Sequence, residues 1–177
     1  LALRGEGALK ISHFIHLRAE ICSETLIEEL DEFGPEDRIR IVSLMDHTPG
    51  QRQFTDTTQL RVYLSGKYAM GDDEIEAHIA FQKGVKARYG VAHEETAVRR
   101  AGELGAILAS HDDTTAGHVA RSREIGAALA EFPTTLEAAE ACRAHGIAVM
   151  MGAPNVVRGG SHSGNVAAAD LADRGLL

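Results

Sequence analysis

The chain has 177 residues, of which 44% are hydrophobic and 25% charged, and its formal net charge at pH 7 is −8. This composition is typical of a single folded domain and excludes a collagen-like, low-complexity or disordered polypeptide. The acidic balance argues against nucleic acid as a partner, and no stretch approaches the roughly 18 apolar residues of a membrane span. Two cysteines without metal or redox spacing, Cys22 and Cys142, suit the reducing cytoplasm, where we expect the protein.

Five short apolar segments alternate with helical patterns along the chain, and each is rich in Ile, Val, Leu or Ala, as buried parallel strands are. Helix signals separate them; Thr134 and Glu137, for example, read as a capping box, and Gly146 follows as a helix stop. The order predicts an α/β fold with a parallel sheet and right-handed crossovers. The strand segments are 8–17, 39–45, 106–109, 127–132 and 147–151.

The second and third apolar segments lie much farther apart than the others, which predicts an insertion. It covers residues 54–100 within a single domain of residues 1–177, and its charged, moderately amphipathic sequence predicts helices on the loop side of the sheet. A solvated arm, an oligomer contact and a lid are the alternative roles for it.

The stretch VSLMDHTPG, residues 42–50, ends an apolar strand in Asp46-His47 and turns at Pro49-Gly50. Reactive groups in parallel sheets collect beyond the carboxyl ends of the strands. If the strands present one face inward, side-chain alternation brings Glu20, His47 and His111 to one mouth. A carboxylate and two imidazoles suit a divalent metal ion, and hydrogen-bonded structural roles are the alternative.

Two acids follow His111, and a helix start at Thr114-Thr115 comes next. We expect Asp113 to cap that helix. Asp112 suits either a cap or a catalytic role, and we take it as the catalytic candidate.

The segment PNVVRGGSHSGN, residues 154–165, is rich in glycine and leads into a helix that Asn165 is expected to cap. Glycines allow close backbone approach, and amides at a helix N-terminus bind phosphate well. The motif is neither a P-loop nor GxGxxG, so a plain flexible loop is the alternative. Side-chain donors in it are Arg158, Ser161, His162 and Ser163.

Several stretches together resemble one family, the amidohydrolase-type proteins of bacterial phosphonate breakdown that form the M component of the C–P lyase pathway. The resemblance implies a metal-dependent (β/α)8 barrel that hydrolyses α-D-ribose 1-methylphosphonate 5-triphosphate and releases diphosphate. The stretches, in chain order, are HLRAE (16–20), VSLMDHTPGQRQF (42–54), ASHDDTT (109–115), EFPTTLEAA (131–139) and GAPNVVRGGSHSGN (152–165).

The same resemblance assigns roles to individual residues. His47 and His111 become metal ligands, and Glu20 becomes the carboxylate in the metal-bridging place. The expected cofactor is a divalent metal, with zinc as the first choice, although His and carboxylate donors also suit Mn, Fe or Ni. The residues that we assign to a small phosphorylated or phosphonate substrate are Arg18, Asn155, Arg158, Ser161, His162 and Asn165.

The chain departs from the family pattern in lacking an HxH pair and the general-base Asp of the last barrel strand. A complete eight-unit barrel needs roughly 250 residues. We therefore expect an interior piece of a hydrolase, with about five βα units corresponding to strands 3–7. It should pair with another copy or with further segments of the same protein. The alternatives are a catalytically incomplete fragment and a module that binds a phosphorylated ligand without chemistry.

Overall fold

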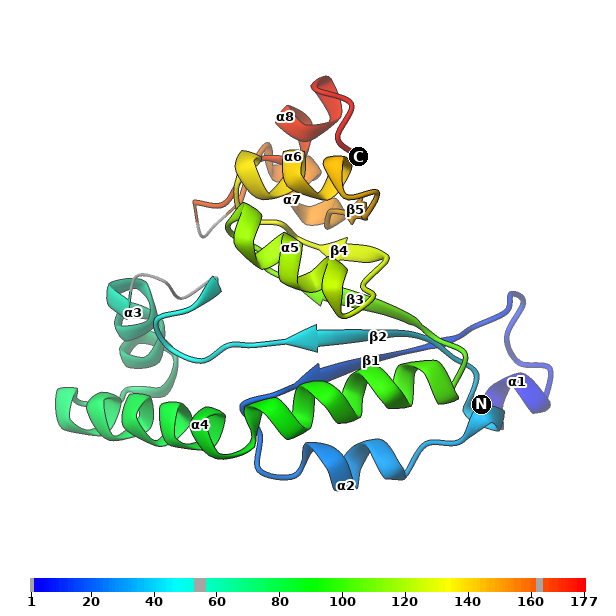
Figure 1. The fold of residues 1–177 in the computed structure, drawn as a ribbon, viewed down its shortest axis with the longest axis horizontal. Helices are drawn as coiled ribbons and strands as arrows, with labels where there is room; N and C mark the ends of the chain where they lie inside the picture. Colours follow the sequence, from blue (N-terminus) through cyan, green and yellow to red (C-terminus); the bar gives the residue numbers. More distant parts are fainter. Residues whose placement is uncertain (1, 53–56, 162–163) are drawn as a thin grey trace.

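The computed structural model describes residues 2–52, 57–161 and 164–177, and its centre is a five-stranded parallel sheet. Each strand pairs with the next one along the chain, in the order β1-β2-β3-β4-β5 (Figure 1). This confirms the α/β class and the parallel sheet; the barrel and its strand numbering stay predictions. The strands are β1 (Ile15–Glu20), β2 (Ile39–Met45), β3 (Ile107–His111), β4 (Leu129–Glu131) and β5 (Ala148–Met150).

The observed strands match four of the predicted segments closely, and the first is displaced. β1 begins at Ile15, which pairs with Ile39, the first residue of β2. The apolar residues before Ile15 have no such partner strand, so hydrophobicity alone predicted the start too early.

The helices connect the strands, and α2, α4 and α6 are among those that contact the sheet. Thr115 and Thr135 cap α5 and α6 by accepting hydrogen bonds from His118 N and Ala138 N. The prediction that Asp113 caps α5 was therefore wrong, because Thr115 is the cap. The capping box of α6 was predicted to begin at Thr134, one residue before the actual cap, Thr135. The described helices are α1 (Ala2–Gly5), α2 (Leu26–Asp31), α3 (Thr57–Tyr68), α4 (Asp72–Glu103), α5 (Ala116–Glu124), α6 (Leu136–Ala144), α7 (Ala153–Arg158) and α8 (Ala168–Asp173), with a 3-10 turn at Pro35–Asp37.

The main core lies between the sheet and the second half of α4. Val42 and Leu44 of β2 are buried there with Ala97 and Ala101 of α4. The small alanines let α4 approach the strands closely, as in a normal crossover helix. A second core joins β4 to α5 and α6 through residues such as Val119 and Cys142.

The first half of α4 and α3 form a helical arm with a small core of its own, made by Leu60, Leu64, Ile75 and Ile79. The arm extends past the carboxyl ends of β1 and β2 (Figure 1). Residues 57–68 and 72–103 are helical, and the end of α4 belongs to the main core. The insertion at residues 54–100 stays a prediction, and residues 54–56 lie outside the described part of the chain. Among the described helices, none is long and apolar enough to cross a membrane.

Leu44 tests how much the sheet depends on this packing, because it is 4% exposed and sits one residue from the end of β2. We predict that Leu44→Ala lowers the free energy of unfolding by about 2–5 kcal/mol in urea denaturation. Leu177, which is 55% exposed, is the matched control, and Leu177→Ala should change stability by less than about 0.5 kcal/mol. Equal effects of the two substitutions would contradict this account of the core.

Candidate functional site

Glu20, the last residue of β1, contacts His47, which follows β2 by two residues. The Glu20 carboxylate oxygen Oε2 meets His47 Nδ1, and Oε1 accepts a hydrogen bond from the His47 amide at 3.2 Å. Cys22 adds its amide at 3.3 Å and its thiol at 3.0 Å, both to Oε1. Glu20 is therefore well supplied with donors, and it fixes how the His47 ring is turned.

His111 and Glu131 repeat this arrangement on the next pair of strands. The two residues lie opposite each other in the β3–β4 register, and His111 Nδ1 is 3.2 Å from Glu131 Oε2. The other oxygen of Glu131 is 3.5 Å from His16 Nε2, which also lies 2.6 Å from Ser43 Oγ. Glu131 and His16 were not predicted as site residues. The available signal was the position of Glu131 at the end of a strand, in register with His111.

Asp112 faces both imidazoles, although it directly follows His111 and would point to the opposite face in a regular strand. Its backbone φ is +53°, a left-handed conformation that breaks the alternation and turns the carboxylate into the site. Asp112 Oδ2 is 3.7 Å from His47 Nε2 and 3.5 Å from His111 Nε2. The backbone turn was missed because no glycine marks it.

The two histidines therefore have the same surroundings. Each ring has a glutamate at Nδ1 and turns Nε2 toward Asp112, and the ring centroids are 5.6 Å apart. One ligand atom from each of His47, His111 and Asp112 fits within 4.8 Å of the others, which suits a single metal ion. Carboxylates behind the ligating imidazoles are a common feature of metal sites, because they fix the ring and its tautomer.

Electrostatics at this site favour a cation. Hydrogen bonds to Asp112 and Glu20 raise the pKa of His47 to about 9 in the metal-free protein. Burial would raise the pKa values of Glu20 and Glu131, but their hydrogen bonds, above all those with His47 and His111, hold both below the ordinary value. The carboxylates are thus ionised at neutral pH. Burial and Glu20 raise the pKa of the Cys22 thiol to about 12, so it stays protonated and donates to Glu20.

A cavity of about 780 Å³ connects this cluster to the glycine-rich segment. His47, His111 and Asp112 lie on its wall, and the volume falls in the usual range for small-molecule sites. The predicted substrate residues that line the cavity are Arg18, Asn155, Arg158, Ser161 and Asn165, whereas His162 lies outside the described residues.

Asn155 also has a structural role that the sequence did not indicate. Its side-chain oxygen accepts a hydrogen bond from Ala168 N at 2.8 Å, and its Nδ2 donates to Val166 O at 3.3 Å. The start of α8 is therefore held by Asn155 instead of the expected cap, Asn165, and the N-cap position is Ala167. This tie fixes α7, and with it Arg158, against the following segment.

The raised pKa of His47 predicts how the metal-free protein responds to pH. The native state binds the proton more tightly than the unfolded state, whose pKa is near 6.5, so this contribution to stability is complete below that pH and disappears as pH rises through about 9. The unfolding free energy should therefore fall between pH 6.5 and 9, and fall less steeply in His47→Gln. The exposed His145 gives the control, since His145→Gln should keep the wild-type slope. Identical slopes in both variants would contradict the assignment.

No family model matches the chain. No solved structure matches it significantly. The chain is 46% identical over 171 residues to alpha-D-ribose 1-methylphosphonate 5-triphosphate diphosphatase of Escherichia coli strain K12, and the match covers 97% of this chain and 45% of that enzyme. The resemblance seen in five separate stretches is thus confirmed along almost the whole chain, which spans about half the length of the enzyme it matches.

Proposed function

We propose that the chain is the central part of a metal-dependent hydrolase of amidohydrolase type in phosphonate catabolism. Its substrate would be ribose 1-methylphosphonate 5-triphosphate, from which it releases diphosphate. The observation that carries this proposal is the convergence of two imidazole Nε2 atoms on Asp112, in the same cavity as Arg158. The name of the similar enzyme supplies the substrate class.

The donor atoms fit a divalent metal, for which zinc is our first choice. We assign His47 Nε2, His111 Nε2 and Asp112 Oδ2 as its ligands, because these three groups face one another. Glu20, which the sequence suggested as a ligand, suits the role of orienting His47, since its two oxygens already meet donors from Cys22 and His47. Glu131 would orient His111 in the same way.

The bound metal would polarise a phosphoryl oxygen and lower the pKa of the attacking water. Asp112 would also serve as the catalytic residue, with the carboxylate oxygen that does not face the imidazoles accepting a proton. Arg158, Ser161 and the glycine-rich backbone, which line the same cavity, would hold the polyphosphate, because charge-assisted hydrogen bonds from arginine to phosphate are strong. Arg18 and Asn165, which also line the cavity, would bind the remaining polar groups of the substrate.

The sheet itself supports a partial barrel. Its strands follow chain order without reversal, and in the described residues β1 and β5 are edge strands. We propose that another copy or further segments of the same protein extend these edges and complete the site. With two free cysteines, the cytoplasm remains the proposed location.

A second candidate is a module that binds a phosphorylated ligand without chemistry. It is favoured by the 45% coverage of the similar enzyme, which leaves room for catalytic groups elsewhere in that protein. Metal binding and turnover separate the two candidates, because a plain phosphate-binding module needs neither.

Metal content is the first test. We predict that the purified protein binds zinc or another divalent ion with about one-to-one stoichiometry, measured by elemental analysis and titration calorimetry. His47→Ala and His111→Ala should abolish this binding because each removes a proposed ligand. His145→Ala, at an exposed position, should retain it. Absence of any divalent ion from the wild-type protein after metal loading would refute the metallohydrolase proposal.

The same titration separates ligands from orienting groups. Glu20→Gln and Glu131→Gln should each weaken metal affinity by about 10- to 100-fold, the usual effect of losing a hydrogen-bond partner behind a ligand. If Glu20→Gln abolished binding as completely as His47→Ala, Glu20 would be a ligand after all, as the sequence suggested.

Arg158 tests the phosphate end of the cavity. Arg158→Ala should raise KM for the triphosphate substrate, or weaken binding of inorganic diphosphate, by about 10-fold, without changing metal content. The control is Arg174→Ala, which removes an exposed arginine just after α8. Equal effects of the two variants would show nonspecific electrostatics in place of a built subsite.

A further inference from the structure

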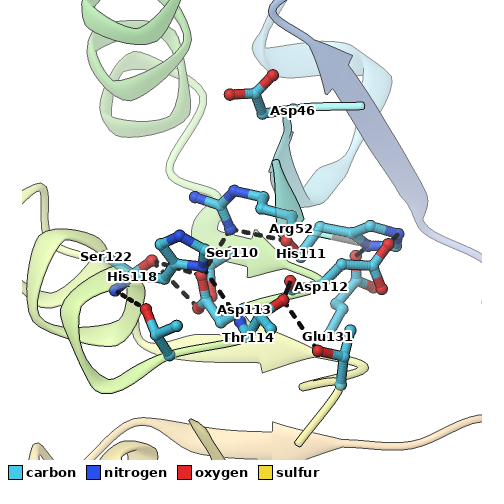
Figure 2. A network of polar contacts seen from close by, with 12 residues as sticks. Asp46, Arg52, Ser110, His111, Asp112, Asp113, Thr114, His118, Ser122 and Glu131 are labelled. Carbon is cyan, nitrogen blue, oxygen red and sulfur yellow. Dashed lines mark hydrogen bonds and ion pairs between the residues drawn. The ribbon is translucent and has the colours of Figure 1, made fainter. Parts of the chain in front are cut away.

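The loop that follows His47 turns back toward β3. Arg52 of this loop contacts the end of β3 at His111. Gly50 and Arg52 both have left-handed backbone angles, with φ of +92° and +48°. This turn brings the Arg52 guanidinium to the end of β3, where Nη1 donates to the His111 carbonyl at 2.7 Å and to Asp113 Oδ1 at 2.5 Å (Figure 2). One nitrogen therefore links the loop that carries His47 to the residues on both sides of Asp112.

Asp113 is held from the opposite direction as well. Its carboxylate is fully buried, and it accepts hydrogen bonds from Ser110 Oγ at 2.6 Å and Ser122 Oγ at 3.2 Å. Figure 2 shows Asp113 between Arg52 and these serines, away from Glu131. A buried carboxylate with this many partners cannot move without leaving charges and donors unpaired. The end of β3 is thus a fixed point against which the loop is held.

These contacts restrain Asp112, because it lies between His111 and Asp113, the two residues that Arg52 contacts. Its amide donates to Glu131 O at 2.9 Å, and its left-handed backbone is stable only if the residues on both sides are restrained. Arg52 restrains them through the carbonyl of His111 and the side chain of Asp113. The Arg52 guanidinium is therefore the contact that relates the position of the Asp112 carboxylate to the loop that carries His47.

We propose that Arg52 is a positioning residue that sets the separation between His47 and the His111–Asp112 pair. The proposal rests on the metal site described under the proposed function. It goes beyond that site because Arg52 is neither a proposed ligand nor a substrate contact. A lysine at position 52 keeps the charge, but its side chain is one atom shorter and ends in an ammonium group, so it does not place a donor where Arg52 Nη1 reaches both acceptors.

The experiment compares Arg52→Lys with Arg100→Lys in the intact protein. Arg100 is a matched control because it is also a partly buried arginine that joins main chain and carboxylate. It donates to the carbonyls of Leu30 at 3.0 Å and Phe33 at 2.6 Å, on α2 and the residues that follow it, and to Glu103 Oε2 at 2.9 Å. Both variants should lose stability to a similar extent. Only Arg52→Lys should weaken zinc affinity, by about 10- to 100-fold.

Crystal structures of the metal-free variants give a second readout that does not require metal binding. Arg52→Lys should displace the loop after β2 and the Asp112 carboxylate, and Arg100→Lys should leave both in place. If wild-type protein bound no metal, the proposed function would fail, and these structures would still decide the role of Arg52. Unchanged positions of His47 and Asp112 in Arg52→Lys would overturn the inference.

Ser122→Ala provides a milder variant in case Arg52→Lys does not fold. It removes one hydroxyl donor from Asp113 without touching the arginine or any cavity residue. The expected result is a smaller loss of zinc affinity, with the metal-free loop partly displaced. Wild-type zinc affinity together with wild-type positions in Ser122→Ala would count against the inference.

Discussion

Pairing of each strand with its successor along the chain is the constraint on which the rest of the structure depends. It aligns the carboxyl ends of β1, β2 and β3 at one edge, so that groups distant in sequence become neighbours. Glu20, His47 and His111 meet there because each lies at or just after the end of a strand. Register then pairs His111 with Glu131, which gives each imidazole its own carboxylate.

The strands and the polar residues at their carboxyl ends could be predicted because both follow from local sequence patterns. Apolar runs of strand length, with acids and histidines at their ends, indicated both the parallel sheet and the position of Glu20, His47 and His111 at or just after strand ends. In the structure Glu20 contacts His47, and His47 lies beside His111. Asp112 was expected to be a helix cap or a catalytic residue. Its position between the two imidazoles could not be predicted, because it depends on a left-handed backbone at a residue other than glycine. Asp113 was expected as a cap, but its burial depends on Arg52 and Ser122, which are remote in sequence.

The cluster of His47, His111 and Asp112 differs in its charge from the ion pairs near it. The cluster gathers carboxylates around two imidazoles and leaves a net attraction for a cation. Behind it, Asp113 is neutralised by Arg52, and Asp46 by Lys86 at 2.8 Å. The acidic groups that face the cavity are thus different from those that already pair with an arginine or a lysine. A metal ion would therefore be attracted to the cavity and not to Asp46 or Asp113.

The continuity of α4 limits how the arm can evolve or be engineered. A helix of 32 residues is a rod roughly 48 Å long, whose far end carries the arm and whose near end is packed under the sheet. A segment that is inserted in a loop can be deleted by joining the two chain ends that flank it, because these ends lie close together. Removal of this arm would cut a continuous helix and leave four amides of its remaining half unsatisfied, so a shortened protein would need a newly designed helix start.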